Sequence, residues 1–575
     1  MIGRTMSHYN ITDKEKRTMN RKLWILSALF LLPSASVLAQ EFPPGFVDPM
    51  PLLAAASEEI GEQNFRCVTF SGTGYGGAVG QVYDNAPNVD WERSELANYT
   101  RMINWETGTS VETFDRVPGG NPASWKYGLG WMGGTPTQQH SRQTFVVNGD
   151  TAWAIDGDGP PVAATAEDAE RWQLDIWLNP AGFLKAARMP GADPKAFWRW
   201  EQIEMGRDGN VVNLTKMHVV SITMLGKYRV DATINPQNQI QRIHVMVHSP
   251  VLGDFNIEHE STNQQQFGDV KWPTNWHSHQ GWDDNYQFAS ESTGHNAYGG
   301  VFPDVQPNVC ASSAPVPDNL QPSTQPDPEI VAVEELADGV YLLGGGPINS
   351  YMVEFADWVA VFEAPINEKR SLAVIEEVVK LAPDKPIRWL ISSHPHFDSI
   401  GGLRTYLHIG STIVTHRNNI DMLNRDVLNY RTQEIEPDIT SLWPPTELAE
   451  GYNWEAINEN FVITDNERIL RIYYVQPLDH VSGMLMAYLP EEKIAFEADL
   501  FNTHESPPDE PTPAMRSFFN QIQRMSLDIE TIAPTFGPPV PYSEFVDALG
   551  DDAMLCETVI SGGAVGMAPC ETLEQ

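Results

Sequence analysis

Two histidines and an aspartate follow an apolar run in the segment Trp389–Gly402, which reads WLISSHPHFDSIGG. At an extended strand end, side chains two positions apart point to the same side. His394, His396 and Asp398 can therefore converge on one point. Imidazole nitrogens and carboxylate oxygens are ligands that a zinc ion accepts. The spacing thus predicts a metal site at the end of a buried strand.

This segment resembles the HxHxDH signature of the metallo-β-lactamase fold, a superfamily of metallohydrolases, over roughly residues 330–575. The last position of the signature is Ser399 rather than histidine. By the same resemblance, His480 is the third histidine of the first metal site and Asp499 is the aspartate that bridges the metals. The resemblance also places Glu363 behind the metal site, where the family usually carries an aspartate.

The second metal position of the family has lost two ligands in this chain. Asp398 remains, but Ser399 replaces one histidine and Phe536 stands where a late histidine followed by glycine is expected. Phenylalanine cannot bind a metal, and a serine hydroxyl is a poor zinc ligand at neutral pH. The sequence therefore predicts one Zn²⁺ per chain, with His394, His396 and His480 as its histidine ligands.

The resemblance implies a hydrolase that acts on a small-molecule substrate. Three neutral imidazoles leave a fourth position for water and can lower its pKa to about 7. The metal-bound hydroxide would then attack an ester, a lactone or a related bond. Asp398 is expected to act as general base or to orient the hydroxide, and it also counts as a metal ligand of the motif. Asp499 is expected to be a fourth ligand or to fix a histidine tautomer.

Two other function classes remain open from the sequence. A degenerate protein could keep the fold and serve as a binding or scaffold protein, because paired ligand loss is what a decayed enzyme would show. A lyase or isomerase could use the metal as a Lewis acid. Two further histidines, His416 at a strand end and His504 after Asp499, are predicted to have structural or rim positions rather than to bind metal.

The elements that position these residues predict an α+β chain of two domains. After residue 330, strands and helices alternate, and the resemblance implies an αββα metallo-β-lactamase-like sandwich. Strands are predicted at 339–343, 350–355, 358–362, 387–392, 411–415, 469–475, 484–489 and 494–496, and helices at 368–381 and 402–408.

The preceding region, 41–310, is predicted to be a mostly antiparallel β domain like those fused to secreted members of the family. Lys227–Ile234 and Gln241–His248 alternate around the turn Asn235–Asn238, which indicates a hairpin. Asn179 and Pro180 predict the start of a helix over Ala181–Met189. Other strands are predicted at 144–149, 217–224, 254–260 and 286–292. The tryptophans are predicted to pack in the core: Trp172, Trp177, Trp198, Trp200, Trp272, Trp276 and Trp282.

Both ends of the β domain are marked by composition. Residues 1–39 combine basic residues, a short apolar run and small residues before Gln40, which predicts a cleaved signal peptide and a secreted or periplasmic protein. Residues 311–329 are rich in proline and serine, which predicts an extended, poorly packed linker. No other segment is apolar enough to predict an integral membrane span. The second domain then covers 330–575.

The charge and the cysteine content indicate which partners are disfavoured and whether disulfides are expected. The formal net charge is −39, with 37 Lys and Arg against 76 Asp and Glu, which disfavours nucleic acid and anionic membranes as partners. The sequence leaves the oligomeric state open. Four cysteines in an exported chain favour disulfides, and three connectivities are possible. The favoured pairs are Cys67–Cys310, which joins the two ends of the β domain, and Cys556–Cys570.

Overall fold

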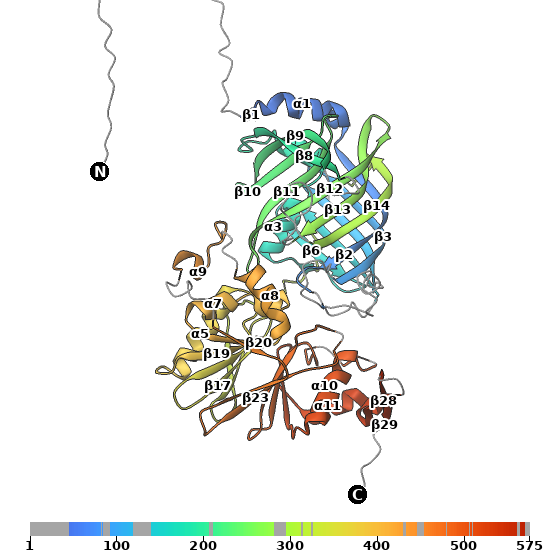
Figure 1. Cartoon of the computed structure of the whole chain (residues 1–575). Coiled ribbons are helices and arrows are strands. Elements are labelled where there is room, and N and C mark those ends of the chain that lie inside the picture. Colours follow the sequence, from blue (N-terminus) through green and yellow to red (C-terminus); the bar gives the residue numbers. More distant parts are fainter. Residues whose placement is uncertain are drawn as a thin grey trace, which may run out of the picture. The chain divides into compact units, whose positions relative to one another are not determined.

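An antiparallel sheet of 14 strands builds the N-terminal domain (Figure 1). Its strand order is β1-β8-β9-β10-β11-β12-β13-β14-β2-β3-β4-β5-β6-β7. The strands are β1 (Phe46–Val47), β2 (Cys67–Ala78), β3 (Glu92–Asn104), β4 (Thr109–Pro118), β5 (Ser141–Asn148), β6 (Thr151–Asp156), β7 (Val162–Ala163), β8 (Lys195–Met205), β9 (Val211–Met224), β10 (Tyr228–Ile234), β11 (Ile240–Ser249), β12 (Gly253–Phe267), β13 (Val270–Gln280) and β14 (His295–Pro307). The predicted β domain is therefore confirmed.

The structure is a computed structural model that describes residues 45–569, apart from 82, 84–91, 119–139, 206–210, 281–294, 312–313, 324–325, 429–432, 445–452, 479, 505–506, 509 and 561–563. The predicted signal peptide, the strand predicted at 286–292 and Trp282 lie outside the described residues. Both domains belong to one compact unit, Pro44–Gln575.

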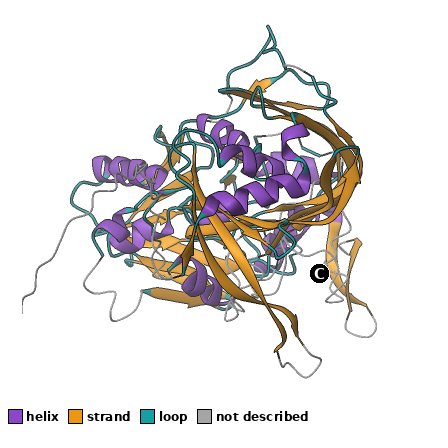
Figure 2. Cartoon of the chain, turned by 90° about the horizontal axis from the view of Figure 1, so that it is seen from above, coloured by secondary structure: helices purple, strands orange, loops and turns teal. Residues whose placement is uncertain are grey.

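Three helices cover one face of the N-terminal sheet: α1 (Pro49–Ile60), α3 (Ala166–Asp175) and α4 (Pro180–Ala186). Figure 2 shows helices lying inside the curve of the strands. Leu53 of α1, Phe183 of α4 and Trp272 of β13 meet in the core. The prediction that all the tryptophans are buried was wrong for Trp198 and Trp200, which are exposed on β8. They lie two positions apart and share a solvent-facing side of their strand.

The start of α4 follows its prediction, whereas its end does not. The Asn179 side chain accepts a hydrogen bond from the Gly182 N–H, as an N-cap does. The helix ends at Ala186 rather than at Met189, and Met189 N–H donates to the Ala186 carbonyl in a tighter turn. Pro190 follows directly, and a proline disfavours helical backbone in the residue before it.

The C-terminal domain contains two facing sheets (Figure 1). The first sheet contains β15 (Ala332–Ala337), β16 (Val340–Gly344), β17 (Ser350–Glu354), β18 (Val359–Phe362), β19 (Ile387–Ile391), β20 (Thr412–His416) and β21 (Trp454–Ile457). The second contains β22 (Asn460–Thr464), β23 (Ile469–Tyr474), β24 (Leu485–Leu489), β25 (Ile494–Glu497), β26 (Thr531–Pro534) and β27 (Val540–Pro541). The predicted strands of this domain are all present.

Helices cover the outer side of each sheet and complete the predicted αββα arrangement. The helices are α5 (Glu368–Leu381) and α7 (Leu403–His408) on the first sheet and α10 (Pro513–Met525) and α11 (Tyr542–Leu549) on the second. The core between the two sheets includes Phe362 of β18 and Phe496 of β25, whose ring centroids lie 5.9 Å apart. Val251, Leu252 and Phe255 of the N-terminal domain belong to the same core cluster as residues of α5 and α7.

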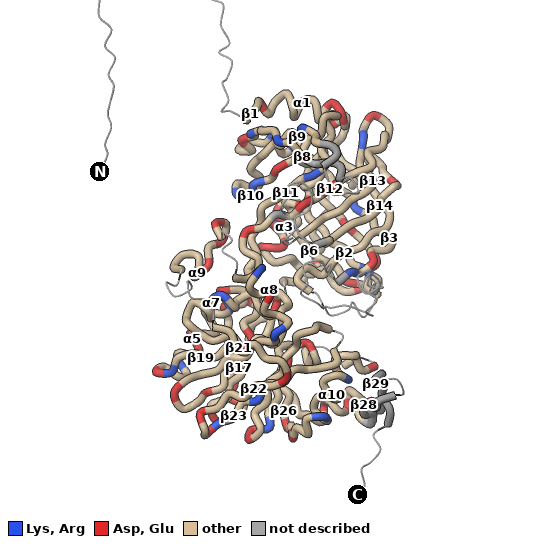
Figure 3. The backbone as a smooth tube through the Cα atoms, viewed as in Figure 1, with Lys and Arg blue, Asp and Glu red and all other residues tan. Residues whose placement is uncertain are grey.

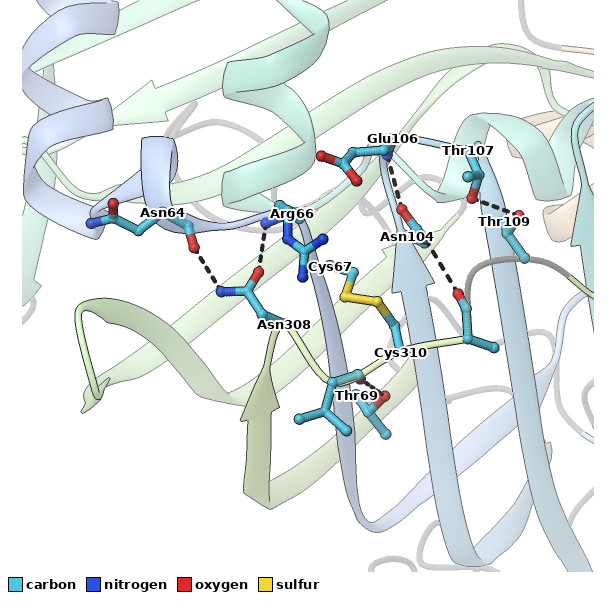
Figure 4. Close-up of a disulfide and its surroundings, with 12 residues drawn as sticks. Asn64, Arg66, Cys67, Thr69, Asn104, Glu106, Thr107, Thr109, Asn308 and Cys310 are labelled. Atoms are coloured by element: carbon cyan, nitrogen blue, oxygen red, sulfur yellow. Dashed lines mark hydrogen bonds between the residues drawn. A yellow bond between two sulfur atoms is a disulfide. The ribbon is translucent and has the colours of Figure 1, made fainter.

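The two ends of the β domain are joined by the predicted disulfide. Cys67 opens β2 and Cys310 follows β14, and their sulfurs are bonded with the Cα atoms 6.3 Å apart (Figure 4). The Asn308 side chain accepts from the Arg66 N–H and donates to the Asn64 carbonyl beside it. Cys570 lies outside the described residues, so the pair Cys556–Cys570 stays a prediction.

The linker is less detached than its composition predicts. Its described residues form no helix or strand, but Gln321 exchanges backbone hydrogen bonds with Pro161 and Ala163 beside β7. Acidic positions occur on strands, helices and turns of both domains (Figure 3). None of the helices in the described part of the chain combines the length and apolar character that a bilayer crossing requires.

Candidate metal centre

The first two histidines follow the end of a buried parallel strand. β19 pairs in parallel with β18 and β20, and its carboxyl end leads through Ser392 and Ser393 to His394. His396 is the residue directly before the short helix α6 (Phe397–Ile400). Both histidine side chains are fully buried. The carboxyl ends of parallel strands are where ligands bind in sheets of this kind.

The second sheet brings the other two residues to the same edge. His480 precedes β24, and Asp499 follows β25 by two residues. Asp499 has φ of +59°, a left-handed backbone conformation that is unfavourable for a residue with a side chain. Strain of this kind is found where the surrounding structure holds a functional side chain in place. The Leu485 N–H donates to the Ser393 carbonyl at 2.7 Å, which ties the two sheets together beside the centre.

Four side chains converge at this edge: His394, His396, His480 and Asp499. One ligand atom from each lies within 4.8 Å of the others. Oδ2 of Asp499 is 3.0 Å from Nε2 of His394, 2.9 Å from Nε2 of His480 and 3.9 Å from Nδ1 of His396. Three imidazole nitrogens and one carboxylate oxygen form a donor set that suits tetrahedral Zn²⁺. The residues present therefore fit a zinc ion.

The pKa shifts within the cluster show which of its members are already in the form that binds a metal ion. Burial, together with the nearby charge of His394, lowers the pKa of His396 to about 3, so this imidazole is neutral at pH 7. Burial opposes ionisation of Asp499, but His394 and the hydrogen bonds from the histidines carry the pKa of this carboxyl well below its usual range. Neutral imidazole and ionised carboxylate are the forms that bind metal. Burial opposes the charge of His394, but the Asp499 carboxylate raises the pKa of this imidazole, so His394 must release its proton when a metal binds.

Two buried glutamates lie next to the cluster. Oε1 of Glu363 accepts the Ser393 N–H at 2.6 Å, and Oε2 of Glu497 accepts the Leu500 N–H at 2.8 Å. Burial raises the pKa of Glu363 to about 7 and that of Glu497 to about 8. These two carboxyl groups thus hold the backbone next to His394 and next to Asp499. The family resemblance points to Glu363, whereas sequence reasoning misses Glu497, although it ends an apolar strand two residues before Asp499.

Ser393 adds a contact that orients one ligand. Its Oγ lies 2.7 Å from Nδ1 of His394, on the side of the ring away from Asp499. A hydrogen bond at one ring nitrogen fixes which nitrogen remains for the metal. Ser393 therefore helps to present Nε2 of His394 to the centre.

Asp398 lies beside the cluster rather than in it. Its Oδ1 accepts a hydrogen bond from Nε2 of Gln81, 3.1 Å away, a residue of the N-terminal domain that sequence reasoning missed. Burial and the charge of Asp499 raise the pKa of Asp398 above its usual value. Ser399 is buried and its Oγ has no hydrogen-bond partner among the described residues.

The two other histidines lie apart from the four-residue cluster. His416 is buried at the end of β20, where its Nε2 contacts the Asn458 carbonyl at 3.1 Å and its ring stacks on Tyr474. His504 is exposed.

Nothing in the sequence around Gln81 marks Gln81 as a site residue, because its contact with Asp398 spans 317 residues.

Comparison with known families supports the identity of this domain. Residues 343–544 match the sequence model of the Metallo-beta-lactamase superfamily, and this stretch contains all four residues of the cluster. The C-terminal domain has the metallo-beta-lactamase fold, and the superfamily consists of metal-dependent hydrolases.

Individual relatives are distant. A linear primary-alkylsulfatase from Pseudomonas sp is 28% identical over 92 residues, which are 15% of this chain and 14% of that protein. The matched part is thus a small share of the length of that relative. A metallo-beta-lactamase structure from Pontibacter korlensis has 14% identity and a TM-score of 0.30, covering 38% of this chain and 97% of that chain. The DIM-1 metallo-beta-lactamase has 13% identity and a TM-score of 0.30, covering 39% and 96%.

Proposed function

We propose that this chain, with its C-terminal domain of the metallo-beta-lactamase superfamily, is a secreted or periplasmic zinc-dependent hydrolase with one metal ion per chain. The observation that carries the proposal is the convergence of three buried histidines and Asp499 at the shared edge of two sheets. Such a donor set is more than core packing needs, because burying four titratable groups without a ligand is unfavourable.

A bound zinc ion would polarise the scissile group and activate water. His394, His396 and His480 would hold the ion through neutral nitrogens, and Asp499 would supply the anionic oxygen. Asp398, beside the cluster and held by Gln81, would accept the proton of the attacking water.

A single ion is proposed because the residues for a second one are missing. Position 399 carries a buried serine and position 536 a phenylalanine. Asp398 is the one side chain left of that second set, and among the described residues the cluster with metal-binding geometry does not include it. One carboxylate alone does not hold zinc firmly, so occupancy of about one per chain is expected.

The substrate is proposed to be a small molecule with an ester, lactone or related bond. Sulfate esters enter this group because the matched Pseudomonas protein is named as an alkylsulfatase, although the match covers 15% of this chain. The net charge of −39 argues against a nucleic-acid substrate, since phosphates would be repelled.

A second candidate function is binding without catalysis. The paired loss at Ser399 and Phe536 favours it, because a protein released from catalysis loses ligands in this way. Such a protein would keep zinc as a structural ion and would turn over no substrate. Metal content alone does not separate the two functions, whereas turnover does.

The deciding experiment uses the chain from residue 40 onward, loaded with zinc and freed of excess metal. Zinc is counted by mass spectrometry, and hydrolysis is measured on a nitrophenyl ester, an acyl lactone and a long-chain alkyl sulfate. We expect about one zinc per chain and hydrolysis of at least one substrate. His396→Ala should abolish both, whereas His504→Ala, a change at an exposed histidine of the same domain, should leave both unchanged.

Two results would contradict the proposal. Absence of bound zinc would remove the metal centre, and hydrolysis that survives His396→Ala would assign the activity to another site. Bound zinc without turnover on any substrate would favour the binding function. Export is tested separately, by N-terminal sequencing of the protein recovered outside the cytoplasm, which should begin at Gln40.

A further inference from the structure

A short segment of the N-terminal domain, of which Val79–Gln81 and Tyr83 are described, reaches the metal centre of the C-terminal domain. It follows β2, which lies between β14 and β3 in the large sheet. The Gln81 N–H donates to the Ala78 carbonyl at 3.0 Å, so the chain turns directly after the strand. The position of Gln81 is therefore set by a central strand of the sheet.

This turn contacts the residue next to His396. The Phe397 N–H donates to the Gly80 carbonyl at 3.3 Å. Gly80 has φ of +85°, and a Cβ at this position would lie 2.4 Å from Cγ of Phe397, so the close approach requires glycine. Val79 and Phe397 also pack together against Ala297.

The same segment contacts the loop of the third histidine. The Ser482 N–H, two residues after His480, donates to the Tyr83 carbonyl at 2.9 Å. Both histidine-bearing loops, which belong to different sheets, are therefore held by backbone hydrogen bonds from one short piece of the N-terminal domain. Contacts of this kind fix ligand loops relative to one another.

Between these backbone contacts, the Gln81 side chain enters the site. Its Nε2 donates to Oδ1 of Asp398 at 3.1 Å. Its Oε1 is buried and has no hydrogen-bond partner among the described residues. Buried side-chain oxygens normally accept a hydrogen bond. The unpartnered Oε1 therefore distinguishes Gln81 from an amide that only fills space in the core.

We propose that Gln81 is a positioning residue of the metal centre, which holds the Asp398 carboxylate in place through Nε2, and that the N-terminal domain is thereby part of the catalytic unit. The inference rests on the proposed function for the role of Asp398. It assigns the N-terminal domain a task in the site, beyond a separate binding or export role. The free Oε1 is the atom that would receive a donor from substrate or water.

The test compares Gln81→Ala and Gln81→Glu with Gln237→Ala, a change in an exposed turn of the same domain. Gln81→Glu keeps the size of the side chain but replaces the donor with a carboxylate that faces Asp398. In the zinc protein, kcat should fall on the order of tenfold or more in both Gln81 variants, as is usual for partners of site residues. KM should change little, and Gln237→Ala should match the wild type.

Two further readouts separate positioning from general damage. In an Asp398→Ala background, Gln81→Ala should cause no additional loss of kcat, because its effect runs through that carboxylate. In protein loaded with Co²⁺ instead of zinc, the visible absorption bands of the Gln81→Glu protein should shift, since the charges beside the ion change. Cobalt content should stay near one per chain in all variants.

The inference is overturned if the cobalt spectrum of Gln81→Glu superimposes on that of the wild type, or if an active enzyme keeps its kcat in both Gln81 variants. Failure of the proposed function is distinguishable from this result. A wild type that hydrolyses nothing, together with a shifted Gln81→Glu spectrum, would reject the hydrolase and retain the contact of Gln81 with the centre.

Discussion

Nε2 of His480 lies 2.9 Å from Oδ2 of Asp499, so a histidine before β24 faces an aspartate after β25. The same oxygen is 3.0 Å from Nε2 of His394, which comes from the other sheet. One carboxylate oxygen is thus the common neighbour of ligands from both halves of the sandwich. This arrangement makes Asp499, rather than Asp398, the acidic member of the proposed zinc site.

The two aspartates should respond differently to loss of charge. Asp499→Asn should weaken zinc binding by more than tenfold, because an anionic ligand becomes a neutral amide. Asp398→Asn should retain zinc but lower kcat by about a hundredfold or more, as loss of a general base does. Zinc retained after dialysis against a chelator and initial rates measure the two effects. Asp357→Asn, in an exposed turn, is the control. Equal zinc retention in both site variants would contradict this assignment.

A buried carboxylate in the N-terminal domain should make stability depend on pH. Oε2 of Glu258 is 2.8 Å from His244 Nε2, and Oε1 is 3.1 Å from His279 Nδ1. Burial opposes its charge, but these hydrogen bonds lower the pKa of Glu258 to about 2. Since the folded-state pKa lies below the unfolded value, the stabilisation is present above about pH 4.5 and is lost as pH falls toward 2.

The corresponding test is urea unfolding at several pH values between 6 and 3. Over this range, Glu258 should account for a loss of about 2 kcal/mol in the free energy of unfolding. Glu258→Gln should be less stable than the wild type at pH 6 and should show a flatter decline toward pH 3. Glu167→Gln, at an exposed helix position, should keep the slope of the wild type. An unchanged slope in Glu258→Gln would contradict the prediction.

Removal of the Cys67–Cys310 disulfide should lower stability without removing the fold. The bond closes a separation of 243 residues, and long closed loops restrict the unfolded chain most. The double variant Cys67→Ser, Cys310→Ser should lose roughly 2 to 5 kcal/mol of unfolding free energy. Thermal unfolding of the wild type with and without reductant gives the same comparison. A midpoint insensitive to both treatments would show that pairing of β2 with β14 suffices.

Arg370 should stabilise the first residues of the C-terminal domain against unfolding. Its guanidinium is fully buried and donates to the carbonyls of Ile330, Leu343 and Gly344 at 2.7, 2.6 and 3.1 Å. Arg370→Met leaves these carbonyls without a donor, which should cost on the order of 2 to 4 kcal/mol. Denaturant unfolding measures the loss, with Lys369→Met at the exposed neighbouring position as control. Equal stability of the two variants would rule out this role.

Local patterns predicted much of the fold. The helix α5 has the predicted bounds, Glu368–Leu381, because Asn367 caps it and apolar residues recur on one face. The hairpin of β10 and β11 follows from strict alternation around a turn. Trp198 and Trp200 were predicted wrongly because aromatic content does not tell which face of a strand meets solvent.

For the site, the residue types, their order along the chain and the loss of ligands at Ser399 and Phe536 follow from residue identity and spacing alone. Which side chains meet depends on the folded arrangement of the two domains. It placed Asp499 among three histidines and left Asp398 outside that cluster. It also brought Gln81 to Asp398 across 317 residues. Such a contact depends on how a strand of one domain ends beside a loop of another, and no local periodicity encodes that distance.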